Sequence, residues 1–257
     1  MPHILDTLAS PVIIAHRGAS HYAPENTLAA FQLAVEQGAD GIELDVRLSA
    51  DGHLVVIHDA SVRRTTNGRG WVANLTLGQL RELNVSEHCP KRAGGALPRQ
   101  QIPTLDEVFE TLGNQLLINV ELKPLVRHTK ILSEKVAFTI QRHRLKDVVI
   151  CSSFSPFALK ALAQFAPEIP RGLLLPAGAF PSQLAVSAGR KLTYQTLHPD
   201  YRDLLKGTPS AFFQQSARQR VFAYTINDET DIRRLFQWGV DGIFTDDPPL
   251  ALHIRDS

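Results

Sequence analysis

Cysteine, excess charge and long apolar runs are scarce in this sequence, and each shortage excludes a class of protein. Only two cysteines, Cys89 and Cys151, occur in 257 residues, so neither a disulfide framework nor a cysteine-based zinc motif can form. Cys151 follows an apolar run and is predicted to be a buried, unreactive thiol. The formal net charge is +1, so no global field attracts nucleic acid or an acidic membrane. An anionic ligand must therefore be bound by local charge.

Export and membrane signals are missing as well. Residues 1–10 lack a basic start followed by an apolar stretch, so no signal peptide is expected. The longest apolar runs fall far short of the roughly 20 residues that cross a bilayer. We therefore expect a cytoplasmic protein without a membrane span. Its oligomeric state stays open, because one sequence does not reveal a surface patch.

Short apolar runs alternate with amphipathic segments along nearly the whole chain. The strand candidates are residues 12–15, 41–45, 54–57, 117–121, 148–151, 172–175, 192–197, 221–225 and 242–245. Helices are predicted at 25–37, opened by Asn26 or Pro24, at 104–112, at 155–165 and at 227–238, opened by Asn227. Alternation over this length predicts an α/β fold, a (β/α)8 TIM-type barrel of one domain over residues 1–257.

Nine strand candidates are one too many for such a barrel, and a hairpin accounts for the surplus. Asp51-Gly52 is a strong turn signal between 44–48 and 53–57. If these two residues form the turn, position i pairs with position 103 − i, and His58 lies opposite Asp45. Residues 54–57 are then an antiparallel arm on the second barrel strand. The glycine-rich stretch 60–102 is predicted to be a cap-like insertion over the barrel mouth, without a core of its own.

Acidic residues stand at the ends of two predicted barrel strands, where barrel enzymes place their reactive groups. Glu43 and Asp45 are two residues apart and therefore point to the same face, and Glu121 ends the next strand. Three carboxylates without cysteine suit one hard divalent cation, Mg²⁺ or Ca²⁺, with Mn²⁺ possible. The alternative that stays open is a set of structural salt bridges with nearby basic residues, namely Arg17, Arg47 and Lys123.

Two histidines stand at the same end of the predicted barrel. His16 follows the first strand and His58 follows the hairpin arm. One could deprotonate a nucleophile while the other protonates a leaving oxygen, which suits phosphoester cleavage beside a cation. Arg17 and Lys123 would add positive charge for the phosphate.

Other residues give weaker signals. Asn26 could contact the site or cap the first helix, and Phe154 could line the pocket or pack in the core. His198 reads as a surface histidine, and Asp246 reads as a turn-forming residue and not a metal ligand. Three arginines of the insertion could meet an anionic substrate, although solvated surface positions are more common; they are Arg63, Arg64 and Arg69.

Taken in order, these motifs resemble the glycerophosphodiester phosphodiesterase family over residues 12–249. The matching segments are His16-Arg17-Gly18, Pro24-Glu25-Asn26-Thr27, Glu43-Leu44-Asp45-Val46, His58-Asp59, Glu121-Leu122-Lys123 and the stretches 224–227 and 239–246. The resemblance implies a capped barrel with one divalent cation on Glu43, Asp45 and Glu121, and His16 and His58 as the acid/base pair. It also implies a small-molecule phosphodiester substrate, cleaved to glycerol 3-phosphate and an alcohol. One departure is Tyr224, where many members have tryptophan.

Three alternatives remain. A lysophospholipase D type hydrolase would need an apolar groove near the mouth, which Trp71, Leu75 and Leu77 could line. A non-catalytic phosphodiester-binding barrel would bind without turnover, although it has no need of an acid/base pair. A metal-dependent amide hydrolase fits poorly, because such sites rely on histidine-rich zinc ligation.

Overall fold

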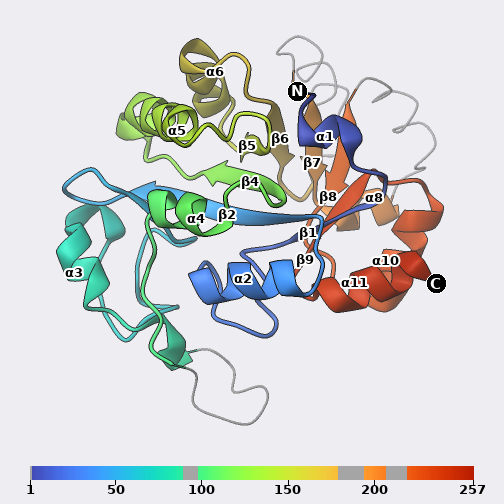
Figure 1. Cartoon of the computed structure of the whole chain (residues 1–257), viewed down its shortest axis with the longest axis horizontal. Coiled ribbons are helices and arrows are strands. Elements are labelled where there is room, and N and C mark those ends of the chain that lie inside the picture. Colours follow the sequence, from blue (N-terminus) through green and yellow to red (C-terminus); the bar gives the residue numbers. More distant parts are fainter. Residues whose placement is uncertain (1, 89–97, 179–193, 207–218) are drawn as a thin grey trace.

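Eight parallel strands hydrogen bond in sequence order around a closed barrel. The computed structural model describes residues 2–88, 98–178, 194–206 and 219–257 (Figure 1). The barrel strands are β1 (Val12–Ala15), β2 (Gly41–Leu48), β4 (Leu117–Leu122), β5 (Val149–Ser153), β6 (Arg171–Leu175), β7 (Thr196–Pro199), β8 (Arg220–Ala223) and β9 (Gly242–Thr245). Because β1 pairs with both β2 and β9, the eight described barrel strands close on themselves. The predicted (β/α)8 barrel is confirmed; of the predicted strand 192–197, residues 192 and 193 lie outside the described residues.

Most of the helices follow a barrel strand and cover the barrel, whereas α1 precedes β1 and α3 lies in the insertion. They are α1 (Ile4–Thr7), α2 (Leu28–Glu36), α3 (Leu77–Arg81), α4 (Leu105–Leu112), α5 (Thr129–His143), α6 (Pro156–Phe165), α8 (Tyr201–Lys206), α10 (Glu229–Gln237) and α11 (Pro248–Asp256), with 3-10 turns η1 (Val72–Asn74), η2 (Val85–His88) and η3 (Val126–His128). In the described ranges we find no helix of the length and apolarity that a bilayer crossing needs.

Two of the predicted helix starts are wrong for the same reason. Thr27, and not Asn26 or Pro24, caps α2 by accepting a hydrogen bond from the Ala30 N–H. Asp228, and not Asn227, caps α10. Both asparagine amides are bonded to carboxylates at the barrel mouth instead. At both strand-to-helix turns, an asparagine that could cap the helix bonds instead to a carboxylate of the site.

The amino end of the barrel is closed by apolar packing. Leu5 of α1 joins Val12, Ile14, Phe222 and Phe244 in one buried cluster. Each such side chain contributes roughly 1.5–3 kcal/mol by leaving water. Cys151 is fully buried, as predicted, and burial raises the pKa of its thiol far above the ordinary value. The polar chemistry is thus left to the carboxyl ends of the strands.

The one described strand outside the barrel, β3 (Leu54–Val56), pairs with β2 in the antiparallel direction, as predicted. The predicted register was wrong by one residue: Ile57, and not His58, hydrogen bonds opposite Asp45, through an N–H to carbonyl distance of 2.9 Å. The cause is Gly52, whose φ of +80° makes the turn three residues long instead of two. His58 is the second residue after the strand and begins the insertion.

The insertion after β3 has a small core of its own, which corrects the prediction that it would lack one. Seven buried residues form this cluster, and they are Val55, Ile57, Val62, Val72, Leu80, Val85 and Ile102. The side chains of β3 alternate between two faces. One face packs toward α4 and α5, and the apolar side chain on the other face packs against the insertion. Figure 1 shows β2 extending out of the barrel toward the segment that contains α3. Cys89 lies outside the described residues.

Candidate active site

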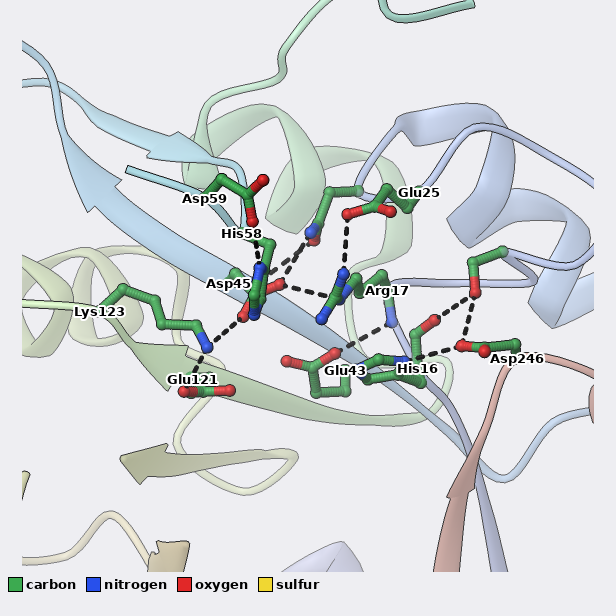
Figure 2. Close-up of polar contacts among 12 residues, drawn as sticks. His16, Arg17, Glu25, Glu43, Asp45, His58, Asp59, Glu121, Lys123 and Asp246 are labelled. Atoms are coloured by element: carbon green, nitrogen blue, oxygen red, sulfur yellow. Dashed lines mark hydrogen bonds and ion pairs between the residues drawn. The ribbon is translucent and has the colours of Figure 1, made fainter. Parts of the chain in front are cut away.

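The three acidic residues converge at the carboxyl ends of β2 and β4. Asp45 pairs with Glu121 across the two parallel strands, and Glu43 lies two residues earlier on the same face. One oxygen of each carboxylate lies within 4.8 Å of the others, and all three side chains are buried. We call Glu43, Asp45 and Glu121 the acidic trio. Figure 2 shows the trio and the two histidines at the same end of the barrel, with Glu121 next to Lys123.

Charge in the acidic trio is only partly balanced. Burial and the neighbouring carboxylates raise the pKa of Glu43 well above its usual range and raise the pKa of Glu121 to about 7. Burial also disfavours the charged form of Asp45, but Lys123 and Arg17 outweigh it and lower the pKa of that group. Three buried oxygens of the trio lack a hydrogen-bond partner among the described residues, and of these only Glu43 Oε1 has no ion pair with Lys123 either. The trio therefore has room for a further positive charge.

Basic side chains do stand beside the acids, so the salt-bridge alternative is partly realised. Lys123 Nζ lies 2.7 Å from Glu121 Oε1 and 3.2 Å from Asp45 Oδ1. The guanidinium of Arg17 lies 3.5 Å from Asp45 Oδ2, and the backbone N–H of Arg17 donates a hydrogen bond to the Glu43 carboxylate. Arg47 does not join them, since it donates to the carbonyl oxygen of His58. Within the described part of the chain, these pairs leave Glu43 Oε1 without a partner.

Both histidines line one cavity of about 180 Å³, together with Glu43, Glu121 and Lys123. His16 Nδ1 lies 2.7 Å from Asp246 Oδ1, and His58 Nδ1 lies 2.6 Å from Asp59 Oδ1. A carboxylate on Nδ1 fixes the ring and leaves Nε2 as the nitrogen available to a ligand. Burial lowers the pKa of His58, which the charge of Asp45 offsets only in part.

The two supporting aspartates were not predicted from the sequence. Asp246 also accepts hydrogen bonds from Ser20 Oγ at 2.9 Å and from Asn227 Nδ2 at 2.6 Å. Burial opposes its charge, yet His16 and these donors lower its pKa to about 2. The available signal was position, because Asp246 directly follows β9 at the end where the other reactive groups stand.

Asp59 belongs to a longer chain of charges. Arg64 donates to Asp59 Oδ2 at 2.7 Å and to both oxygens of Glu25 at 2.7 Å. Glu25 in turn accepts from Arg17 at 2.9 Å. Arg64 was predicted to be a solvated or substrate-facing residue, but it connects the support of His58 to Arg17.

Other predicted residues fall into place around the cavity. Asn26 is buried and bonded to Asp45 at both ends of its amide, donating at 2.8 Å and accepting from the Asp45 N–H at 3.2 Å. Phe154 lines the cavity, with Lys123 Nζ 5.7 Å from its ring. Tyr224 contacts Phe154 edge to face and also lines the cavity.

His198 is not at the surface, so that prediction was wrong. It is fully buried inside the barrel, stacked on Phe222, with Nε2 2.9 Å from Thr196 Oγ1. Burial lowers the pKa of His198 to about 3, so the ring is neutral. The alternation along β7 turns it inward together with Thr196.

This arrangement is that of a barrel hydrolase, with an acidic cluster suited to a cation and two carboxylate-supported histidines at the carboxyl end of the strands. The model of the glycerophosphoryl diester phosphodiesterase family matches residues 16–250. The chain belongs to this family and is a phosphoric diester hydrolase.

Individual relatives agree with the family match. A glycerophosphodiester phosphodiesterase of Caldanaerobacter subterraneus is 38% identical over 95% of this chain and 97% of its own length. One from Bacillus subtilis is 34% identical over 94% of this chain and 85% of its own. Among solved structures, a phosphodiesterase of Oleispira antarctica in complex with the product sn-glycerol-3-phosphate has a TM-score of 0.87. The two chains are 32% identical, and the match covers 98% of this chain and 99% of the Oleispira antarctica chain.

Proposed function

We propose that the chain hydrolyses glycerophosphodiesters, such as glycerophosphocholine or glycerophosphoethanolamine, to glycerol 3-phosphate and an alcohol. The family match over residues 16–250 supports the reaction class. The product held by the similar Oleispira antarctica enzyme supports the glycerol 3-phosphate half. The observation on which the proposal rests is the pair of carboxylate-supported histidines that line one cavity with the acids.

The acidic trio would hold one divalent cation. Three buried carboxylates within 4.8 Å, one with an oxygen that no described residue pairs with, fit a hard cation with oxygen ligands. Bound there, the cation would polarise a phosphoryl oxygen and stabilise the negative charge of the transition state. Mg²⁺ and Ca²⁺ both accept three carboxylates, and Mn²⁺ shares their preference for oxygen.

The side chains around the trio would bind the phosphate and transfer the protons. Lys123 and Arg17 place positive charge beside the trio, where the phosphate would be bound. One histidine accepts a proton through Nε2 from the attacking water, the bond between phosphorus and the leaving alcohol breaks, and the other histidine protonates that alcohol. A glycerol hydroxyl can attack in place of water, and water then opens the cyclic phosphate that results. Burial lowers the pKa of His58, which favours the neutral ring that can accept a proton. Asn26 holds Asp45, and Phe154 forms one wall of the cavity.

The test is an assay of both products from glycerophosphocholine, with metal-loaded protein and with protein treated with chelator. We expect glycerol 3-phosphate and choline, with activity lost on chelation and restored by Mg²⁺, Ca²⁺ or Mn²⁺. Release of phosphocholine instead would contradict the predicted bond cleavage. Binding of the substrate without turnover at saturating cation would favour the non-catalytic barrel.

A further inference from the structure

A second cavity adjoins the active site, between the insertion and the loop that follows β4. Its volume is about 220 Å³. Its walls are mainly apolar, and the side chains that matter here are Leu48, Trp71, Val72, Pro124, Leu125 and Leu132. We call this cavity the Trp71 groove. Two further candidates from the sequence do not line it, since Leu75 and Leu77 pack against the small core of the insertion.

Lys123 joins the groove to the active site. It lines both cavities, and its Nζ lies 2.7 Å from Glu121 Oε1. The groove therefore starts within one side-chain length of the acidic trio. A molecule whose phosphate lies beside Lys123 can extend into it without leaving the protein surface.

Large apolar side chains are also exposed on segments that follow the barrel strands. In the described part of the chain, seven large apolar side chains are exposed. Five of them stand on the segments that follow β3, β4 and β5, and they are Trp71, Leu125, Val126, Phe154 and Phe157. Trp71 is 61% exposed, although its side chain lines the groove. Two of the five, Trp71 and Leu125, line the groove itself, and exposed apolar side chains there mark a place where an apolar ligand gains by leaving water.

The active-site cavity has polar side chains deeper in the barrel, because Asn119 precedes Glu121 by two residues on β4. Asn119 donates to Ser152 Oγ at 2.9 Å, and both residues line the cavity and are buried. Asn119 Oδ1 has no hydrogen-bond partner among the described residues. A buried acceptor of this kind fits a hydroxyl group, so this deeper part of the cavity suits the glycerol half of the substrate. The other alcohol of the diester must then point outward, toward Lys123.

We propose that the Trp71 groove is a subsite for the leaving alcohol, and that it selects glycerophosphodiesters whose leaving alcohol bears an alkyl chain. The inference rests on the proposed function and adds the substrate class. The occupant follows from continuity: the deeper polar part takes the glycerol half, Lys123 takes the phosphate, and the apolar walls beyond Lys123 meet the chain of the alcohol.

The experiment uses metal-loaded protein and a series of glycerophosphoalkanols with ethyl, butyl, hexyl and octyl groups, below their micelle concentrations. We expect kcat/KM to rise with chain length, by up to about fourfold per methylene that is fully buried. Trp71→Ala and Leu125→Ser should flatten this rise and leave hydrolysis of the ethyl ester unchanged. Phe138→Ala is the matched control, because Phe138 is 62% exposed on α5 and does not line the groove.

Each outcome decides one question. A flat series in the unmodified protein, or an equal slope in Trp71→Ala, overturns the subsite while hydrolysis itself stands. A gain seen only with lysophosphatidylcholine, whose chain is on the glycerol, also overturns it and favours the lysophospholipase D type activity. If no ester is hydrolysed, the proposed function fails, and the groove is judged by binding of octylphosphocholine. Binding that is lost in Trp71→Ala supports the groove, and absence of binding rejects it.

Discussion

At the scale of single residues, carboxylates fix the ring orientation and the tautomer of His16 and His58. Asp246 and Asp59 each bond to an Nδ1 atom, so both rings are oriented before any ligand arrives. Removing such a partner permits the other tautomer and a rotated ring, as in other enzymes with carboxylate-histidine pairs. The supporting aspartates should therefore affect the chemical step more than substrate binding.

We expect Asp246→Asn to lower kcat by roughly ten- to ten-thousandfold with KM within about threefold. Steady-state kinetics with glycerophosphocholine measures this. Asp247→Asn is the matched control: Asp247 caps α11, and asparagine caps a helix about as well. Unchanged kcat in the Asp246→Asn enzyme would show that Asp246 does not support His16 in catalysis.

The acidic trio makes the metal-free protein sensitive to pH. The pKa of Glu121 is raised to about 7 in the folded state, and that of Glu43 is raised too. A raised carboxyl pKa stabilises the fold below the unfolded value and loses that contribution as pH rises through the folded value. For Glu121 alone the loss between about pH 4.5 and 7 is on the order of 3 kcal/mol.

We therefore expect the free energy of unfolding of the chelated protein to fall between pH 5 and pH 7.5, and saturating cation to remove most of that fall. Urea unfolding at both pH values, with and without cation, measures it. In Glu121→Gln the pH dependence of the chelated protein should shrink. A chelated protein that is equally stable at both pH values would contradict the proposed charge imbalance.

At the scale of elements, strand-end turns position the site, and the sequence predicts some of their contacts and not others. Glu43, Asp45 and Glu121 were predictable because the two-residue period of a strand fixes their face. The helix starts were not, because Asn26 and Asn227 are good caps by local rules and are recruited by Asp45 and Asp246 across the fold. His198 was misread because burial is set by barrel packing and not by its immediate neighbours.

The hairpin between β2 and β3 depends on one glycine. Gly52 adopts φ +80°, where a side chain costs roughly 1 kcal/mol. We expect Gly52→Ala to destabilise the fold by about 1–2 kcal/mol and to lower kcat, because the turn sets the register that delivers His58. Gly239→Ala is the control, with φ +78° and open space around it, after α10. It should lose similar stability in urea unfolding and keep its kcat.

At the scale of the whole molecule, the closed barrel brings together groups from both ends of the chain. His16 follows β1 and is supported by Asp246 after β9, which is its neighbour only because the sheet closes. The barrel and the acid positions were predictable from periodicity and the ordered motifs. The supporting contacts across the closure were not, since they join residues 230 positions apart in the sequence. The single-domain organisation with a cap-like insertion stays a prediction.

The central claim is that His16 and His58 act as acid and base beside a cation held by the acidic trio. The most direct test measures glycerol 3-phosphate release from glycerophosphocholine by the metal-loaded His16→Ala and His58→Ala proteins, with cation binding confirmed in each. We expect each variant to bind the cation and to lose at least about a hundredfold in kcat. Undiminished turnover in either variant would contradict the assignment.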